Sequence, residues 1–389
     1  MTIGVRREIL KGLKRVVIKV GSSIIAKRIK GKPGMANGLD VNGISLLAQT
    51  VLQIIDRGCE VVLVSSGAIM AGRERLDLHR AELSIPEKQA CAAIGQSYLM
   101  HTYEKQFEKY GFKVAQILLS HDDLENRKRF LNAKHTLEAL LEHRVVPIIN
   151  ENDSVTVDEI KIGDNDTLSA TVTCLINAQL LIILSDVDGL CSRDPSIKKG
   201  QLDDPLEVIE HVNSITDKIE KLAGGTNSSI TVGGMHTKVL AAKQTMSFGI
   251  PTLIVNGFDS NISDKIFEGE SIGTLFWAGH DKIKKRKHWI AYTLKPSGKI
   301  TVDLGAGKAI LARGKSLLPT GVIKVEGKFE FGNTVRVVDE TGTEIARGLV
   351  NYNFRDLKRI MGMKTGAVRK IFGESFYKEV IHRDDLVVL

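Results

Sequence analysis

Short apolar runs alternate with longer segments of helical periodicity over the first 256 residues. The apolar runs are rich in β-branched residues and have the length of strands; they lie at 15–20, 60–64, 113–119, 145–149, 180–184 and 252–255. Between them, apolar residues recur every three or four positions, which predicts helices over 41–57, 86–110, 127–143, 166–178 and 236–248. This alternation predicts a doubly wound α/β fold, in which helices cover both faces of a mainly parallel sheet.

Three glycines support the helix boundaries. Gly58, Gly111 and Gly249 each follow a predicted helix and precede the next strand. Glycine readily adopts the left-handed conformation that commonly ends a helix. We therefore expect three of the helices to end at these positions.

The pattern changes after about residue 257, where the segments become short, β-rich and separated by turn sequences such as PSGK and ETGT. The segment DKIKKRK carries five basic residues in seven, which is typical of a solvated linker. We expect a first domain at 1–265, a linker at 266–287, a small all-β domain at 288–375 and a C-terminal tail at 376–389 that packs on the small domain.

The net charge of +8 is unevenly distributed. Residues 281–389 contain 22 Lys/Arg and 12 Asp/Glu, whereas the first 280 residues contain 32 and 34. The basic excess therefore belongs to the C-terminal part, and an argument for nucleic-acid binding can be made only there.

Cysteine spacing and hydropathy indicate the compartment. The four cysteines fall in no CxxC or zinc-binding spacing, which favours reduced thiols in the cytoplasm. No apolar run approaches the roughly 18 residues that a membrane span requires. We expect a cytoplasmic protein with no membrane partner.

Small and cationic residues follow the first two strands, at the end where parallel sheets bind ligands. Lys19 lies at the end of the first strand and Gly21 in the turn after it, while Ser65 and Ser66 follow the second strand. Turn amides can bind an anion, and a lysine adds a full positive charge. These turns are candidates for binding phosphate or carboxylate groups.

A second candidate phosphate site lies near residue 234. Gly233 and Gly234 directly precede a predicted helix that carries Lys238 in its first turn. Free amides, the helix dipole and the lysine charge all favour an anion there.

Carboxylates collect after the fourth strand, in INENDSVTVDEIKIGDNDTLSA. Glu151, Asp153, Asp164 and Asp166 lie in this region without a histidine or cysteine. Asp164 or Asn165 could cap the helix that is predicted to begin near 166. Capping needs one such residue, however, and the region holds several.

The absence of familiar motifs narrows the chemistry. The sequence has no GxxxxGK[ST], no GxGxxG after the first strand and no HExxH. Two lysines, anion-binding turns and carboxylates without an obvious general base favour phosphoryl transfer, where catalysis is mostly positioning and charge neutralisation. An acceptor that is itself a carboxylate is ionised at neutral pH and needs no base.

The motifs VIKVGSS, VSSGAIMAG, INENDSVTVDEIKIGDNDTLSA, SDVDGL and GGMHTK, in this order, resemble the amino acid kinase family and, within it, the enzymes that phosphorylate L-glutamate. The segments ITVDLGAGKAIL, GKSLLPTGV and IHRDD resemble the barrel-shaped PUA domain that ends those enzymes. The resemblance implies transfer of phosphate from ATP, with Mg²⁺, to the γ-carboxylate of L-glutamate. The product would be γ-glutamyl 5-phosphate, in the first step of proline biosynthesis.

The resemblance also implies roles for individual residues. Catalytic roles fall to Lys19, Lys238 and Asp166, with Asp166 holding both lysines. Glutamate is expected to contact Ser66, Gly67, Asp153 and Asn165. ATP is expected to contact Lys19, Gly21, Ser185, Asp186, Val232, Gly233, Gly234, Met235, His236, Thr237 and Lys238. Mg²⁺ is expected to be carried mainly by the ATP phosphates, and the resemblance assigns it no protein ligand.

Two other functions stay open. A sister kinase acting on N-acetylglutamate, aspartate or UMP would share the sheet and both lysines, but INENDS and the PUA-like tail are not expected in it. An RNA-binding protein could use the basic PUA-like tail, although the aromatic residues there are few and dispersed. The resemblance further implies a homo-oligomer and feedback inhibition by proline.

Overall fold

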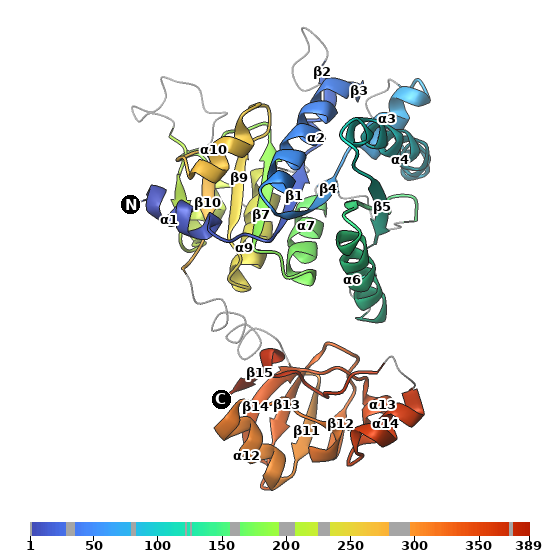
Figure 1. The fold of residues 1–389 in the computed structure, drawn as a ribbon, viewed down its shortest axis with the longest axis vertical. Coiled ribbons are helices and arrows are strands. Elements are labelled where there is room, and N and C mark those ends of the chain that lie inside the picture. Colours follow the sequence, from blue (N-terminus) through green and yellow to red (C-terminus); the bar gives the residue numbers. More distant parts are fainter. Residues whose placement is uncertain are drawn as a thin grey trace. The chain divides into compact units, whose positions relative to one another are not determined.

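The computed structural model describes residues 2–28, 36–78, 83–120, 123–124, 127–155, 164–193, 207–224, 234–279, 296–372 and 376–389. The chain divides into two compact units, one of residues 1–246 and 250–279 and the other of residues 247–249 and 280–389 (Figure 1). Among the described residues, the first unit holds an eight-stranded sheet and the second a five-stranded sheet.

The eight-stranded sheet has the order β5-β6-β4-β1-β7-β9-β10-β8. Six of its strands are β1 (Arg15–Val20), β4 (Glu60–Ser65), β5 (Val114–Leu119), β6 (Val146–Glu151), β7 (Leu180–Ser185) and β9 (Thr252–Asn256). All six pair in parallel. The predicted strands are confirmed to within two residues at each end.

The other edge of the sheet was not predicted. Strand β10 (Thr274–Phe276) pairs antiparallel with β9, and β8 (His211–Val212) pairs with β10. The linker was expected to begin at 266, but helix α10 (Ile262–Glu268) and β10 occupy this range within the first unit. Three residues, two of them apolar, are too short a run to predict a strand, and pairing with β9 stabilises β10.

The predicted helices are also present. They are α2 (Val41–Asp56), α4 (Ile85–Glu108), α6 (Arg127–Glu142), α7 (Asp164–Leu175) and α9 (Met235–Ser247). Gly58, Gly111 and Gly249 have positive φ, as expected for the ends of three of them. No helix in the described part of the chain is long and apolar enough to span a membrane.

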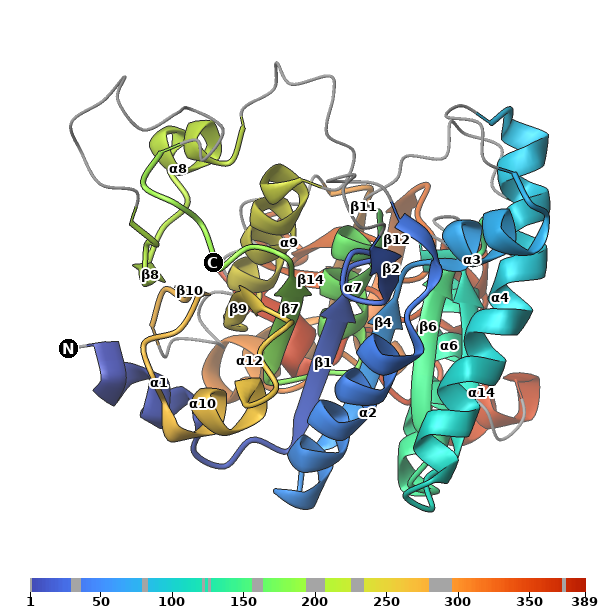
Figure 2. The ribbon, with the colours of Figure 1, turned by 90° about the horizontal axis from the view of Figure 1, so that it is seen from above.

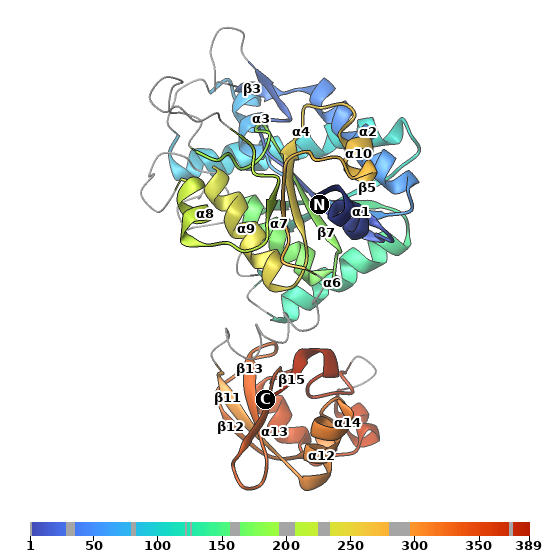
Figure 3. The same cartoon turned by 90° about the vertical axis from the view of Figure 1, so that its left-hand side faces the viewer.

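Besides α10, three more short helices in the described part of the first unit were not predicted: α1 (Thr2–Leu10), α3 (Ala68–Arg75) and α8 (Asp217–Leu222). Tertiary contacts hold α1 in place, because the buried guanidinium of Arg6 donates to the backbone carbonyl oxygens of Glu210, Glu270, Ile272 and Gly273. Figure 3 shows α8 beside α9, where Lys243 pairs with Glu220. The spacing of apolar residues along the sequence cannot predict such contacts.

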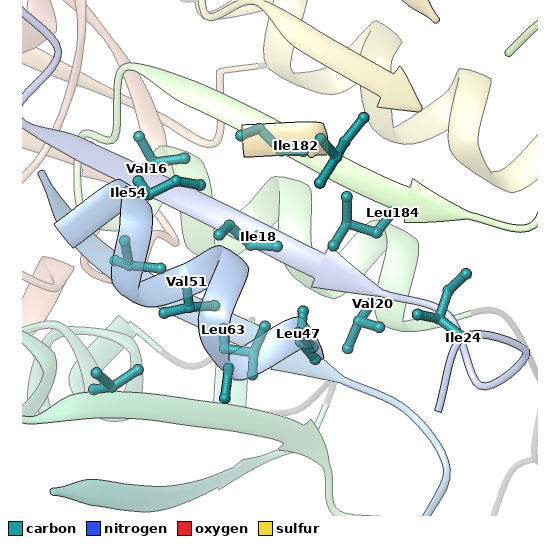
Figure 4. Packing of buried hydrophobic residues seen from close by; sticks show 14 of the residues in the cluster. Val16, Ile18, Val20, Ile24, Leu47, Val51, Ile54, Leu63, Ile182 and Leu184 are labelled. Carbon is teal, nitrogen blue, oxygen red and sulfur yellow. The ribbon is translucent and has the colours of Figure 1, made fainter. Parts of the chain in front are cut away.

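Residues of β1 alternate between two hydrophobic cores. Val16, Ile18 and Val20 face α2, which crosses this side of the sheet (Figure 2) and packs on it through Leu47, Val51 and Ile54 (Figure 4). Val17 belongs to the core on the opposite face, together with apolar residues of α7 and α9. Because side chains two residues apart in a strand share a face, Lys19 lies on the same side as Val17.

The second unit contains the expected small β-domain, and helices accompany its sheet. The strands are β11 (Gly298–Val302), β12 (Val322–Gly327), β13 (Thr334–Val338), β14 (Glu344–Leu349) and β15 (Leu386–Val388), in the order β12-β11-β13-β14-β15. The helices are α12 (Leu304–Arg313), α13 (Phe354–Ile360) and α14 (Thr365–Phe372). Asp303 and Asn353 cap the first two. The final strand, β15, lies in the C-terminal tail and pairs with β14.

Helices α3 and α4 approach each other at glycines. A Cβ atom at Gly95 of α4 would overlap the carbonyl oxygen of Ala68, and one at Gly72 of α3 would overlap that of Cys91. Because α3 follows the turn after β4 directly, this contact also fixes the position of that turn.

Gly95→Ala is expected to lower the free energy of unfolding by about 3 kcal/mol, since the added methyl group meets backbone that cannot move aside easily. Urea denaturation measures this loss. Gly4→Ala is the matched control, because Gly4 is an exposed residue of α1 with nothing within 4 Å of an added Cβ. A loss for Gly95→Ala no larger than that for the control would contradict the close packing of α3 on α4.

Candidate active site

Three charged side chains meet at the carboxyl end of β1. Lys19 comes from the end of β1, Asp166 from the first turn of α7 and Lys238 from the first turn of α9. The exposed fraction is 5% for Lys19, 0% for Asp166 and 6% for Lys238, so all three are buried. Strand alternation directs Lys19 toward the face that α7 and α9 cover.

The carboxylate of Asp166 bridges the two ammonium groups. Its Oδ1 lies 2.7 Å from Nζ of Lys19, and its Oδ2 lies 3.4 Å from Nζ of Lys238. The hydroxyl of Thr237 donates to Oδ2 at 2.6 Å. The structure therefore brings together the three residues predicted to be catalytic, and the two lysines and one carboxylate carry one net positive charge.

Burial and charge act on these groups in opposite directions. Burial raises the pKa of Asp166, but Lys19, Lys238 and the hydrogen bond from Thr237 together hold it below its ordinary value. Burial lowers the pKa of Lys19, and Asp166 opposes that change. An ionised carboxylate therefore orders both ammonium groups inside the protein.

The turns after β1 and β7 border this cluster. The backbone N–H of Gly21 donates to the carbonyl oxygen of Leu184 at 3.2 Å, and a Cβ at Gly21 would lie 3.9 Å from Nζ of Lys19. Ser185 is buried at the end of β7, and its hydroxyl donates to Asp186 at 3.4 Å. The negative charge of Asp186 also raises the pKa of Lys19, although less than Asp166 does.

The start of α9 supplies further polar groups. Gly234 immediately precedes the helix, and Met235, His236 and Thr237 form its first turn. Nδ1 of His236 is buried and has no hydrogen-bond partner among the described residues. Helix-start amides and the helix dipole favour a phosphate here. Val232 and Gly233, also predicted to contact ATP, lie outside the described residues.

Asn165, the residue before Asp166, faces a different set of groups. Its Nδ2 donates to Oγ of Ser66 at 2.9 Å and to Oδ1 of Asn150 at 3.0 Å. Its Oδ1 is buried without a partner in the described part of the chain. The structure thus places Asn165 and Ser66 together, as expected for two residues of one binding site.

The turn after β4 requires a glycine. Gly67 has φ of 106° and is the residue before α3, and a Cβ there would lie 2.8 Å from Cδ1 of Ile25. This conformation directs the chain from Ser66 into α3.

A groove of about 600 Å³ lies between α4, β5 and the segment after β6. Asp153 lines it, as do Gln96 of α4 and Ala68, the residue after Gly67. Lys19 and Lys238 do not line it. Asn165 and Ser66 do not line it either, and the groove is connected to them through Gln96, which is hydrogen-bonded to Asn150.

Sequence reasoning missed Asn150 and Gln96. Asn150 is 2% exposed and ends the apolar run of β6, while Gln96 is 7% exposed and lies on the buried face of α4. Ala92 and Leu99, at helical spacing from Gln96, are buried on the same face. A glutamine at an otherwise apolar helical position was the signal that could have identified Gln96.

Residues 14–256 match the model of the amino acid kinase family, and residues 298–372 match that of the PUA domain. The chain belongs to the amino acid kinase family, as its motifs predicted. Its relatives include the glutamate 5-kinase of Geobacter sulfurreducens, which is 49% identical over 99% of this chain and 100% of the relative. The glutamate 5-kinase of Thermoanaerobacter pseudethanolicus is 47% identical over 96% of this chain and 98% of the relative. A solved structure, carbamate kinase from Giardia lamblia bound to AMP-PNP, is 17% identical, with a TM-score of 0.47 over 69% of this chain and 100% of that one.

Asp166→Asn is expected to lower the free energy of unfolding at pH 7 by about 3 kcal/mol, because two buried ammonium groups lose their compensating charge. Urea denaturation measures the change. Asp264→Asn is the control: Asp264 pairs with Arg57, but 48% of its side chain is exposed, and an exposed pair contributes at most about 1 kcal/mol. Equal losses in the two variants would contradict the compensating role of Asp166.

The stability difference between the wild-type protein and Asp166→Asn is expected to depend on pH in acid. Burial raises the pKa of Asp166, but the two lysines lower it by more than burial raises it. The pKa in the folded protein therefore lies below the value of about 3.9 in an unfolded chain. The ionised group contributes fully above about pH 4, and its contribution is lost as the pH falls through the folded pKa. Unfolding curves from pH 7 to pH 2 should show a constant difference that shrinks below about pH 4. A difference that grows in acid would exclude a lowered pKa.

Proposed function

We propose that the protein transfers the γ-phosphoryl group of ATP to the γ-carboxylate of L-glutamate, giving γ-glutamyl 5-phosphate and ADP, in the first step of proline biosynthesis. One observation carries this proposal. Two neighbouring residues at the start of α7 contact two different groups of side chains. Asp166 forms ion pairs with both lysines, and Asn165 donates a hydrogen bond to Ser66. Relatives named glutamate 5-kinase match nearly the whole chain, which supports the same activity.

Lys19 and Lys238 bind the phosphoryl group during its transfer. They approach Asp166 from β1 and α9, so a γ-phosphate near them meets two ammonium groups whose positions are already fixed. Preorganised charge of this kind stabilises the negative charge that spreads over the equatorial oxygens. Gly21, Ser185, Asp186 and the segment Val232 to Thr237 contact the rest of ATP.

L-Glutamate binds on the Asn165 side of α7, where Ser66, Gly67 and Asp153 complete its site. Oδ1 of Asn165 and the carboxylate of Asp153 suit the α-ammonium group, whereas the Ser66 hydroxyl suits a carboxylate. The γ-carboxylate oxygen forms a bond to Pγ, and the bond from Pγ to the bridging oxygen of ADP breaks. The acceptor is already ionised at neutral pH, so no residue has to remove a proton.

Mg²⁺ accompanies ATP in this proposal. Among the described residues, no three His, Cys, Asp or Glu side chains are grouped as a metal site. We expect the ion to be held mainly by phosphate oxygens and water, because Mg²⁺ commonly keeps several waters in such sites. When bound, it neutralises charge on the β- and γ-phosphates.

The other functions considered from the sequence are not favoured. Matches to glutamate 5-kinases over nearly the full chain argue against a sister kinase and against RNA binding as the main function. We further propose that the protein works in the cytoplasm as a homo-oligomer and that proline inhibits it. Sedimentation of the purified chain and ADP release with added proline test the last two points.

The activity is tested directly by incubating the chain with ATP, Mg²⁺ and one acceptor at a time. Hydroxylamine traps an acyl phosphate as a hydroxamate, and ADP release gives the rate. L-Glutamate should give both products, while N-acetylglutamate and L-aspartate should give little. A preference for either of the other acceptors would replace the proposed substrate.

Lys19→Ala and Lys238→Ala are each expected to lower kcat by about 10² to 10³, since each removes one preorganised partner of the transferring phosphoryl group. Steady-state ADP release with saturating L-glutamate measures kcat. Lys265→Ala serves as control, because Lys265 pairs with Asp259 outside the site. Full kcat in Lys19→Ala would remove Lys19 from the mechanism.

A further inference from the structure

Buried amide side chains form a chain from α4 to the site. Oε1 of Gln96 accepts a hydrogen bond from Nδ2 of Asn150 at 2.9 Å. Oδ1 of Asn150 accepts in turn from Nδ2 of Asn165 at 3.0 Å. These two bonds connect Gln96, which the sequence did not identify as a site residue, to a residue proposed to bind L-glutamate.

The direction of these bonds determines which atom Asn165 offers to a ligand. The two ends of an amide group have nearly the same shape, and the hydrogen-bond network fixes which end points where. Because Gln96 accepts from the amino group of Asn150, the carbonyl oxygen of Asn150 faces Asn165. The backbone N–H of Glu151 donates to the same oxygen at 2.9 Å and favours the same orientation. Asn165 therefore uses its amino group within the protein and keeps its oxygen for another donor.

Each end of this chain carries a buried atom without a hydrogen-bond partner in the described part of the protein, Nε2 of Gln96 and Oδ1 of Asn165, and we take the oxygen of Asn165 as the one that meets a ligand. Oδ1 of Asn165 is buried and has no hydrogen-bond partner among the described residues. Buried polar atoms without a partner are rare in folded proteins. A carbonyl oxygen can only accept a hydrogen bond, and the α-ammonium group of L-glutamate is a strong donor. An amino group of Asn165 in the same place would repel that ammonium.

We propose that Gln96 is a positioning residue for the acceptor substrate. By fixing the orientation of Asn150, it makes Oδ1 of Asn165 available to the α-ammonium group of L-glutamate. Gln96 thus determines the preference for an amino acid over the corresponding plain diacid. This inference rests on the proposed function, because it assumes that L-glutamate is the acceptor.

The test compares L-glutamate with glutarate, the same diacid without the amino group. The KM for L-glutamate and the Ki of glutarate as a competing ligand are measured for the full chain, and their ratio, Ki/KM, reports recognition of the ammonium. Gln96→Met keeps the side-chain volume but removes the acceptor. It is expected to raise the KM for L-glutamate about tenfold, the effect of one hydrogen bond. The Ki of glutarate and the KM for ATP should stay within about twofold, so Ki/KM falls about tenfold.

The chain offers a matched control on the same helix. Gln106 is also buried, with 5% of its surface exposed, but its Oε1 accepts from Nζ of Lys109 at 2.6 Å. Gln106→Met should therefore leave Ki/KM unchanged even if it lowers the melting temperature. Gln96→Glu retains an oxygen that can accept from Asn150 and is expected to keep Ki/KM within about threefold of the wild-type value.

The outcomes separate the inference from the proposed function. The inference is overturned if Gln96→Met changes Ki/KM no more than Gln106→Met does, or if KM rises equally for ATP and L-glutamate. If Gln96→Met fails to fold, Gln96→Asn is measured instead, because its shorter side chain cannot reach Asn150. A fall in Ki/KM for this variant supports the inference, and an unchanged Ki/KM overturns it. A wild-type chain that does not phosphorylate L-glutamate would overturn the proposed function itself.

Discussion

The contact of Asp166 with Lys19 and Lys238 is the interaction on which the rest of the site depends. Two ammonium groups this deeply buried would repel each other and lose their hydration, and only a buried carboxylate makes their proximity tolerable. An ion cluster of this kind is weak support for stability by itself, because desolvation offsets much of the attraction. In the proposed reaction, its value lies in one net positive charge that is already fixed before ATP binds.

Elements far apart in the chain have to meet to build this contact. Alternation in β1 puts Val16, Ile18 and Val20 into the core beneath α2 and turns Lys19 to the other face. There the first turns of α7 and α9 supply Asp166 and Lys238. A shift of β1 by one residue would move Lys19 into the apolar core under α2, so the same pattern specifies the strand register and the position of the proposed catalytic lysine.

The sequence predicts those parts of the structure that depend on local pattern. Strands such as β7 are continuous apolar runs, and the charged residues at strand ends stand out against them. The short strand β10 and the helix α1 could not be predicted, since pairing with β9 and the carbonyl contacts of Arg6 stabilise them. Likewise, the sequence shows that Gln96 is a polar residue at an apolar position of a helix. Its hydrogen-bond partner Asn150, on which its proposed role depends, is 54 residues away in the chain.

In the proposed mechanism, the start of α7 also explains how the two substrates can be held at a fixed separation. Consecutive residues of a helix point about 100° apart, so Asn165 faces β4 and β6 while Asp166 faces β1 and α9. Transfer of a phosphoryl group needs the attacking oxygen within roughly 3 to 3.5 Å of phosphorus. Because one helical turn carries both Asn165 and Asp166, the helix itself fixes the separation of these two contacts in the proposed mechanism. Residues that hold this turn, such as Asn150, which Gln96 of α4 orients, are therefore expected to affect the proposed reaction without touching either substrate.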